Sequence, residues 1–206
     1  MLQCQWHLMH IQTNKQAKEM VNLFNKYEPT IGAFDTETTG LNIGLDKPFL
    51  YQFGFINRDA DTGYAFAVDI ETQPELSKQV INYWQSKLAP KLDLYFGHNV
   101  KFDLHMMHNY GAPYTANNLS DTMFYIRFAH NALTPANGGP PLALKDYAAK
   151  YIDISAKSHE QLLNSEKTAI ASQLNIRLRQ RLKNICSTKE LKELFKDPIT
   201  DLEDLP

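Results

Sequence analysis

Three short apolar segments separated by turns constrain the fold more than any other feature of this sequence. Residues 30–35, 49–57 and 64–69 are rich in the aromatic and β-branched side chains that favour strands. The second and third are joined by about five turn-forming residues, which predicts a β-hairpin. Amphipathic segments lie on either side, at 14–27 and from Pro74 onward. We therefore expect an α/β protein with a mixed sheet flanked by helices.

The rest of the chain continues this alternation. Thr13 and Gln16 have the spacing of a capping box at the start of the first helix. Leu92 to Phe96 predicts another strand, and Ser120 is a suitable N-cap for a later helix. Beyond the helices at 14–27 and after Pro74, the predicted helices cover about 99–109, 120–130 and 142–151.

Composition fits a globular protein and excludes several other classes. The chain has 206 residues, 43% of them hydrophobic, and a formal net charge of -2. These values exclude collagen-like, coiled-coil and globally basic nucleic-acid-coating proteins. Cys4 and Cys186 form no metal-like pair, so we expect both to be inert in a reducing compartment. Neither a secretory signal nor a run of roughly 20 apolar residues is visible, so we expect a cytoplasmic protein with no membrane partner.

The composition changes after about residue 155. We expect residues 1–155 to form the main domain and 156–206 to form a helical, charged extension or insertion of that domain. Arg177, Arg179 and Arg181 in this segment are spaced so that they spread around a helix. This spacing favours a solvated helix over a single nucleic-acid-binding face.

Two acidic residues lie at the C-terminal end of the first predicted strand. Asp35 and Glu37 are two positions apart, so in a strand both side chains point to the same face. Neighbouring carboxylates repel each other unless a proton or a cation neutralises them. Hard oxygen ligands in this arrangement suit Mg²⁺ or Mn²⁺.

A second polar segment follows the strand that ends near Gly97. Asn99 and Asp103 lie four residues apart and hence on one face of the next predicted helix. Because two strands of one sheet can end at the same edge, Asp103 can approach Asp35 and Glu37.

The two segments together carry a family resemblance. Residues 33–41 (AFDTETTGL) and 96–104 (FGHNVKFDL) resemble the first two motifs of the DEDD-type 3′→5′ exonucleases. The second motif is most similar to that of the proofreading domain of family A DNA polymerases, and residues 158–206 resemble a charged insertion found in some bacteriophage-type members. The resemblance covers about residues 30–155 and implies a ribonuclease H-like fold in a bacterial or phage-infected host cytoplasm.

The resemblance implies roles for particular residues. Asp35, Glu37 and Asp103 would be catalytic and would bind two divalent metal ions, Mg²⁺ or Mn²⁺. The partners would be a single-stranded DNA 3′ end and a downstream polymerase domain of the same chain. The residues implied to contact the nucleic acid are Thr38, Leu41, Asn99 and Phe102.

The family's third motif, which supplies a fourth carboxylate and a Tyr or His, is not visible. No Asp after residue 140 has a Tyr four positions or a His six positions earlier. Asp121 fits better as an acid at a helix N-terminus than as the fourth ligand. Residues 197–206 resemble a linker, so we expect a truncated polymerase in which the motif lies downstream. The alternatives are a stand-alone oligonucleotide or RNA exonuclease of the same fold and a non-catalytic nucleic-acid-binding domain.

Overall fold

Two compact units divide the chain, Met1–Gly139 and Pro140–Pro206. The computed structural model describes residues 5–57, 59, 61–114, 117–131, 133, 135–151, 165–166, 168–170, 172–173, 176–177, 180 and 182. Cys4, Cys186, Arg179 and Arg181 lie outside the described residues, so what the sequence suggests for them stays a prediction. The domain boundary expected near residue 155 stays a prediction as well.

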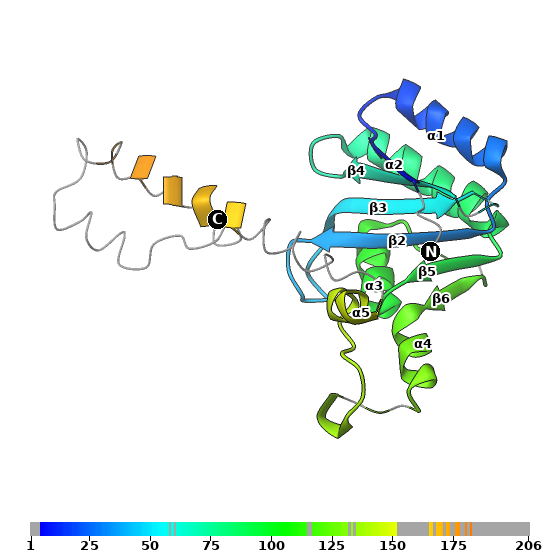
Figure 1. The fold of residues 1–206 in the computed structure, drawn as a ribbon. Coiled ribbons are helices and arrows are strands. Elements are labelled where there is room, and N and C mark those ends of the chain that lie inside the picture. The colour runs from blue at the N-terminus through cyan, green and yellow to red at the C-terminus, as the bar shows by residue number, and fades with distance from the viewer. Residues whose placement is uncertain are drawn as a thin grey trace. The chain divides into compact units, whose positions relative to one another are not determined.

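The first unit is built on a six-stranded mixed sheet with the order β1-β4-β3-β2-β5-β6 (Figure 1). The strands are β1 Gln5–His10, β2 Ile31–Thr38, β3 Pro48–Ile56, β4 Thr62–Asp69, β5 Leu94–Gly97 and β6 Leu119–Asp121. β3 pairs antiparallel with both β2 and β4, which confirms the predicted hairpin. The pairs β1–β4, β2–β5 and β5–β6 are parallel. The predicted mixed α/β sheet of ribonuclease H-like type is confirmed.

The helices of this unit begin and end close to the predicted residues. They are α1 Asn14–Tyr27, α2 Pro74–Tyr83, α3 Val100–Tyr110 and α4 Thr122–Ala129. Thr13 caps α1 by accepting a hydrogen bond from the Gln16 N–H, as the capping box predicted. A π-helical turn, Trp84–Leu88, follows α2 directly. The N-cap predicted at Ser120 is wrong by one residue, because the Asp121 side chain accepts the capping hydrogen bond and Ser120 lies in β6.

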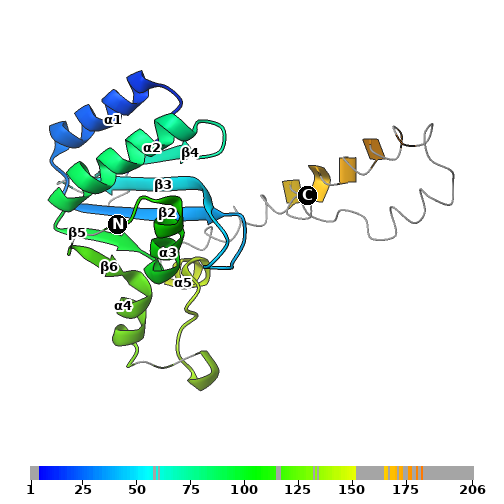
Figure 2. The ribbon, with the colours of Figure 1, turned by 180° about the vertical axis from the view of Figure 1, so that it is seen from behind.

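The hydrophobic core lies on one face of the sheet. Phe24 of α1 and Trp84 after α2 pack edge-on with ring centroids 5.7 Å apart. Both rings also pack against Phe55 of β3. Met107 of α3 belongs to the same buried cluster, and α2 and α3 lie in front of the sheet in Figure 2. The opposite face is more open, since alternate residues of β2 are exposed there.

The second unit contains α5, Leu144–Tyr151. The Tyr147 and Tyr151 rings pack along this helix with centroids 4.6 Å apart. The described residues between Ser165 and Leu182 have helical backbone, and Arg177 is exposed. No helix in the described part of the chain has the length and apolar character needed to cross a membrane.

Candidate active site

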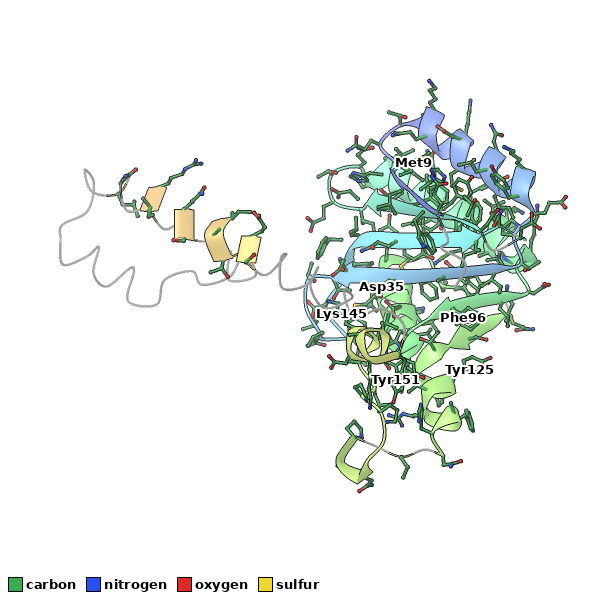
Figure 3. The ribbon with its side chains drawn as sticks, in the orientation of Figure 1. Met9, Asp35, Phe96, Tyr125, Lys145 and Tyr151 are labelled. Carbon is green, nitrogen blue, oxygen red and sulfur yellow. The ribbon has the colours of Figure 1, made fainter. Side chains whose placement is uncertain are left out.

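The site begins where β2 runs past the end of β5. The two strands pair in parallel from Ile31 opposite Leu94 to Ala33 opposite Phe96. β5 ends at Gly97, whereas β2 continues to Thr38. The sequence predicted that the first strand would end at Asp35, which is wrong by three residues. Asp35 and Glu37 therefore lie within the strand, both on its exposed face (Figure 3 labels Asp35).

Helix α3 returns Asp103 to this free edge of β2. The Thr36 N–H donates to Asp103 Oδ1 at 3.1 Å, and the Thr36 hydroxyl donates to the same oxygen at 2.6 Å. A backbone N–H of a strand points along the sheet toward the neighbouring position. The Asp103 carboxylate therefore lies beside the edge of β2, where β5 would otherwise continue.

The Asp103 carboxyl group is buried and electrostatically perturbed. Its side chain is only 3% exposed. Burial raises the pKa of Asp103 to about 6, the Thr36 hydroxyl opposes this rise, and the negative charge of Asp35 adds to it. The effect of Asp35 places the two carboxylates within electrostatic reach of each other. The Glu37 carboxylate accepts a long hydrogen bond, 3.5 Å, from the Gln52 side chain.

The described residues do not form a complete metal-binding group. No three His, Cys, Asp or Glu side chains among the described residues form a group that could hold a metal ion. The structure thus brings Asp103 to the Asp35–Thr36 segment but does not assemble Asp35, Glu37 and Asp103 into one cluster. The donor chemistry nevertheless fits a hard divalent cation, because such a cation would stabilise the buried Asp103 carboxylate and offset its repulsion with Asp35. The three metal ligands stay a prediction.

The turn before α3 is fixed by a residue whose full role the sequence did not reveal. Asp121 accepts hydrogen bonds from the N–H groups of Asn99 at 2.9 Å and Val100 at 3.1 Å. It also accepts from the Met123 N–H at 2.8 Å, which confirms the predicted role as the acid that starts a helix. One carboxylate therefore joins the starts of α3 and α4, and the adjacent Thr122 hydroxyl donates to the Gly97 carbonyl at 3.1 Å.

This anchoring holds Asn99 in an uncommon backbone conformation. Its φ is 58°, in the left-handed region, which asparagine tolerates better than most residues. Asn99 is exposed, and its side chain does not cap the helix. The side chain is thus placed at the start of α3 without being used by the helix itself.

The loop after β2 presents apolar side chains on a braced backbone. Leu41 is 85% exposed and Leu45 is 77% exposed. Asp46 accepts hydrogen bonds from the Thr39 hydroxyl at 3.0 Å and the Asn42 N–H at 2.6 Å. Asn109 of α3 donates to the carbonyls of Ile43 and Asp46. The exposed Leu41 side chain is therefore held on a fixed loop and is accessible to a ligand.

Two further residues predicted to contact nucleic acid lie at the end of β2 and at the start of α3. Thr38 is half-buried, and its hydroxyl donates to the Gly40 carbonyl at 2.8 Å. Phe102 is half-buried in the first turn of α3. Their contacts with nucleic acid stay predictions.

Comparisons with known proteins give a family match. The model of the family DNA_pol_A_exo1, described as 3′-5′ exonuclease, matches residues 8–176. A search of curated proteins gave no match.

Three solved structures illustrate the likeness to other proteins. Brucella melitensis NrnC is 17% identical, with 74% of this chain and 62% of NrnC covered and a TM-score of 0.42. The Aedes aegypti Nibbler EXO domain is 12% identical, with 60% and 56% covered and a TM-score of 0.45. Trypanosoma brucei RNase D in complex with RNA U12 is 14% identical, with 74% and 48% covered and a TM-score of 0.48. The chain spans less than two thirds of the length of each.

Proposed function

Because the chain belongs to the 3′-5′ exonuclease family, we propose that it hydrolyses phosphodiester bonds at single-stranded 3′ ends with two Mg²⁺ or Mn²⁺ ions. In this proposal Asp35, Glu37 and Asp103 are the catalytic residues and the metal ligands. The observation that carries the proposal is the buried Asp103 carboxylate at the free edge of β2, within electrostatic reach of Asp35.

The chain's own residues supply charge and position. Two bound divalent ions would stabilise the attacking and leaving oxygens of an in-line displacement and would make hydroxide accessible at neutral pH. Asp103 offers one buried carboxylate whose Oδ1 is already hydrogen-bonded. Asp35 and Glu37 add two carboxylates from one face of β2. Asp35 and Asp103 interact electrostatically, so a cation bound near them would offset their repulsion.

Four side chains would hold the strand that is cut. Leu41 would lie beside the terminal base, since it is exposed on a braced loop. Asn99, Thr38 and Phe102 would contact the single-stranded end. Stacking of a base on an aromatic ring stabilises binding by about 1–3 kcal/mol, whatever the base. Phe102 therefore suits an enzyme that accepts any sequence.

Two versions of this function differ in the class of substrate. Proofreading of DNA beside a polymerase domain rests on the resemblance of residues 96–104 to the polymerase motif. An exonuclease of RNA or short oligonucleotides would use the same carboxylates and the same loop. A non-catalytic nucleic-acid-binding domain is a second candidate function, because the described residues hold no complete metal cluster. We identify no fourth carboxylate among them, so we expect slow hydrolysis by these 206 residues.

A comparison of substrates tests the proposal. Single-stranded DNA and RNA of one sequence, each labelled at the 5′ end, are incubated with the parent chain in Mg²⁺ or Mn²⁺. We expect products that shorten stepwise from the 3′ end. This shortening should be lost in Asp35→Ala and retained in Asp93→Ala. Asp93 is an exposed acid that precedes β5, at the end of the sheet where β2 begins. Shortening of DNA alone supports proofreading, and shortening of RNA supports the alternative. Binding without metal-dependent shortening of either strand would contradict an enzymatic role.

A further inference from the structure

We infer that Thr36, the residue between the two acids of β2, is a positioning residue that fixes Asp103 Oδ1 and so directs Oδ2 toward a divalent cation. The inference rests on the proposed function and deepens it. Thr36 would touch neither the metal nor the substrate, and it would act through Asp103 alone.

The contact between the two residues is close and buried. Both the Thr36 N–H and the Thr36 hydroxyl donate to Asp103 Oδ1, at 3.1 Å and 2.6 Å. The side chains are 8% and 3% exposed. A hydroxyl-to-carboxylate distance near 2.6 Å is typical of a charge-assisted hydrogen bond, which is stronger than a neutral one. Two donors on one oxygen restrain both the position and the rotation of the carboxylate.

The surroundings of Thr36 do not otherwise call for a hydroxyl. On the same face of β2, the neighbouring buried side chain is Phe34. On β3, the residue opposite Thr36 is the buried Tyr51. Valine has nearly the same shape as threonine and is likewise enriched in strands, so packing alone would accept it. A buried hydroxyl costs free energy unless it is hydrogen-bonded, and Asp103 is the partner that this hydroxyl has.

The branched side chain adds stiffness to the arrangement. A β-branched residue in a strand has few χ1 rotamers, so the Thr36 hydroxyl is held in place before Asp103 approaches. Removing a residue that hydrogen-bonds to a metal ligand and orients it typically weakens metal binding 10- to 100-fold. At a pH well above the Asp103 pKa, where the carboxylate is ionised in parent and variant alike, a role that is only inductive would have the opposite sign, because a hydrogen-bond donor withdraws charge from the carboxylate and weakens it as a ligand. The binding measurements are therefore made at such a pH.

Titration calorimetry with Mn²⁺ separates these possibilities. The variants are Thr36→Val, which removes only the hydroxyl donor, and Thr36→Ser, which retains it. Thr62→Val is the matched control, because the Thr62 hydroxyl also donates to an aspartate, Asp61 Oδ1, at 2.9 Å. Thr62 begins β4 at the opposite end of the sheet from Thr36. Asp35→Ala reports on the metal site itself, and thermal unfolding of each chain reports on folding.

We expect Thr36→Val to bind Mn²⁺ about tenfold more weakly than the parent. We expect Thr36→Ser to lie within about threefold of the parent and Thr62→Val to equal it. Equal or tighter binding by Thr36→Val, while Asp35→Ala binds weakly, would overturn the positioning role and leave the proposed function standing. Weak binding by Thr36→Ser as well as Thr36→Val would also overturn it, because the hydroxyl would then not be the cause. No Mn²⁺ binding by the parent would overturn both proposals.

Discussion

Replacing Asp103 by asparagine should stabilise the protein at neutral pH, and the gain should grow as the pH rises. Burial raises the pKa of the Asp103 carboxyl to about 6 from its ordinary value of 3.8. The folded state therefore holds this proton more tightly than the unfolded state does. The stability that the protonated form contributes is complete below about pH 3.8 and is lost as the pH rises through about 6. The amide of the Asp103→Asn variant would stay neutral throughout and would keep an oxygen for Thr36.

The magnitude follows from the difference between the two pKa values. About two pKa units at about 1.4 kcal/mol each give roughly 3 kcal/mol. The assay is urea unfolding of the parent and of Asp103→Asn at pH 3 and at pH 7.5, with a chelator present. At each pH, the free energy of unfolding of the parent is subtracted from that of Asp103→Asn. The quantity of interest is the change in this difference from the lower to the higher pH. Effects of the amide side chain that do not depend on pH cancel in this double difference.

Asp69→Asn is a control with the opposite sign. Hydrogen bonds from the backbone, led by the Thr72 N–H, lower the pKa of Asp69. Its ionised form therefore stabilises the fold above its unfolded pKa, so Asp69→Asn should lose stability relative to the parent as the pH rises. A double difference near zero for Asp103→Asn, or one with the sign of Asp69→Asn, would refute the reasoning that Asp103 is a buried, destabilised carboxylate.

Three further outcomes are expected. Asp121→Ala should lower the free energy of unfolding by about 2 kcal/mol, since it removes a cap shared by two helices. Amide hydrogen exchange at Asn99 should rise in that variant and would stay unchanged if the cap were unimportant. Leu41→Ala should weaken binding of a single-stranded 3′ end while Mn²⁺ affinity and the melting temperature stay as in the parent. A drop in melting temperature would show that this exposed side chain has a structural role. Trp84→Phe should lose about 1–3 kcal/mol of stability because it removes the buried Trp84 Nε1 donor to the Tyr95 hydroxyl, and unfolding that matches the parent would contradict this.

The helices and the central strands could be predicted because local chemistry specifies them. The Thr13 cap of α1 and the turn between β3 and β4 are local signals, and each lies where it was expected. β1 was not predicted, because five of its six residues are exposed and the polar–apolar alternation of residues 5–8 breaks at Met9. β6 has only three residues. Its partners lie far away in the sequence, so no local pattern could reveal it.

The candidate site was predictable only in outline. Strand ends at one edge of a sheet implied that Asp103 would approach β2, and the structure confirms that approach. The role of Thr36 depends on β2 continuing past the last residue of β5, which is a matter of relative strand length. The second role of Asp121, at the start of α3, depends on a contact between residues 22 apart in sequence. Neither follows from motif spacing.

The most direct test of the proposed metal site is the position of Mn²⁺ in a crystal of this chain, located by its anomalous scattering. We predict a Mn²⁺ ion about 2.1 Å from Asp103 Oδ2, the distance typical of a small hard cation. Asp35 should contribute a second carboxylate oxygen, and Asp103 Oδ1 should keep its hydrogen bonds to Thr36. Mn²⁺ bound elsewhere on the chain, or bound through Asp103 Oδ1 with the Thr36 hydrogen bonds broken, would contradict this assignment.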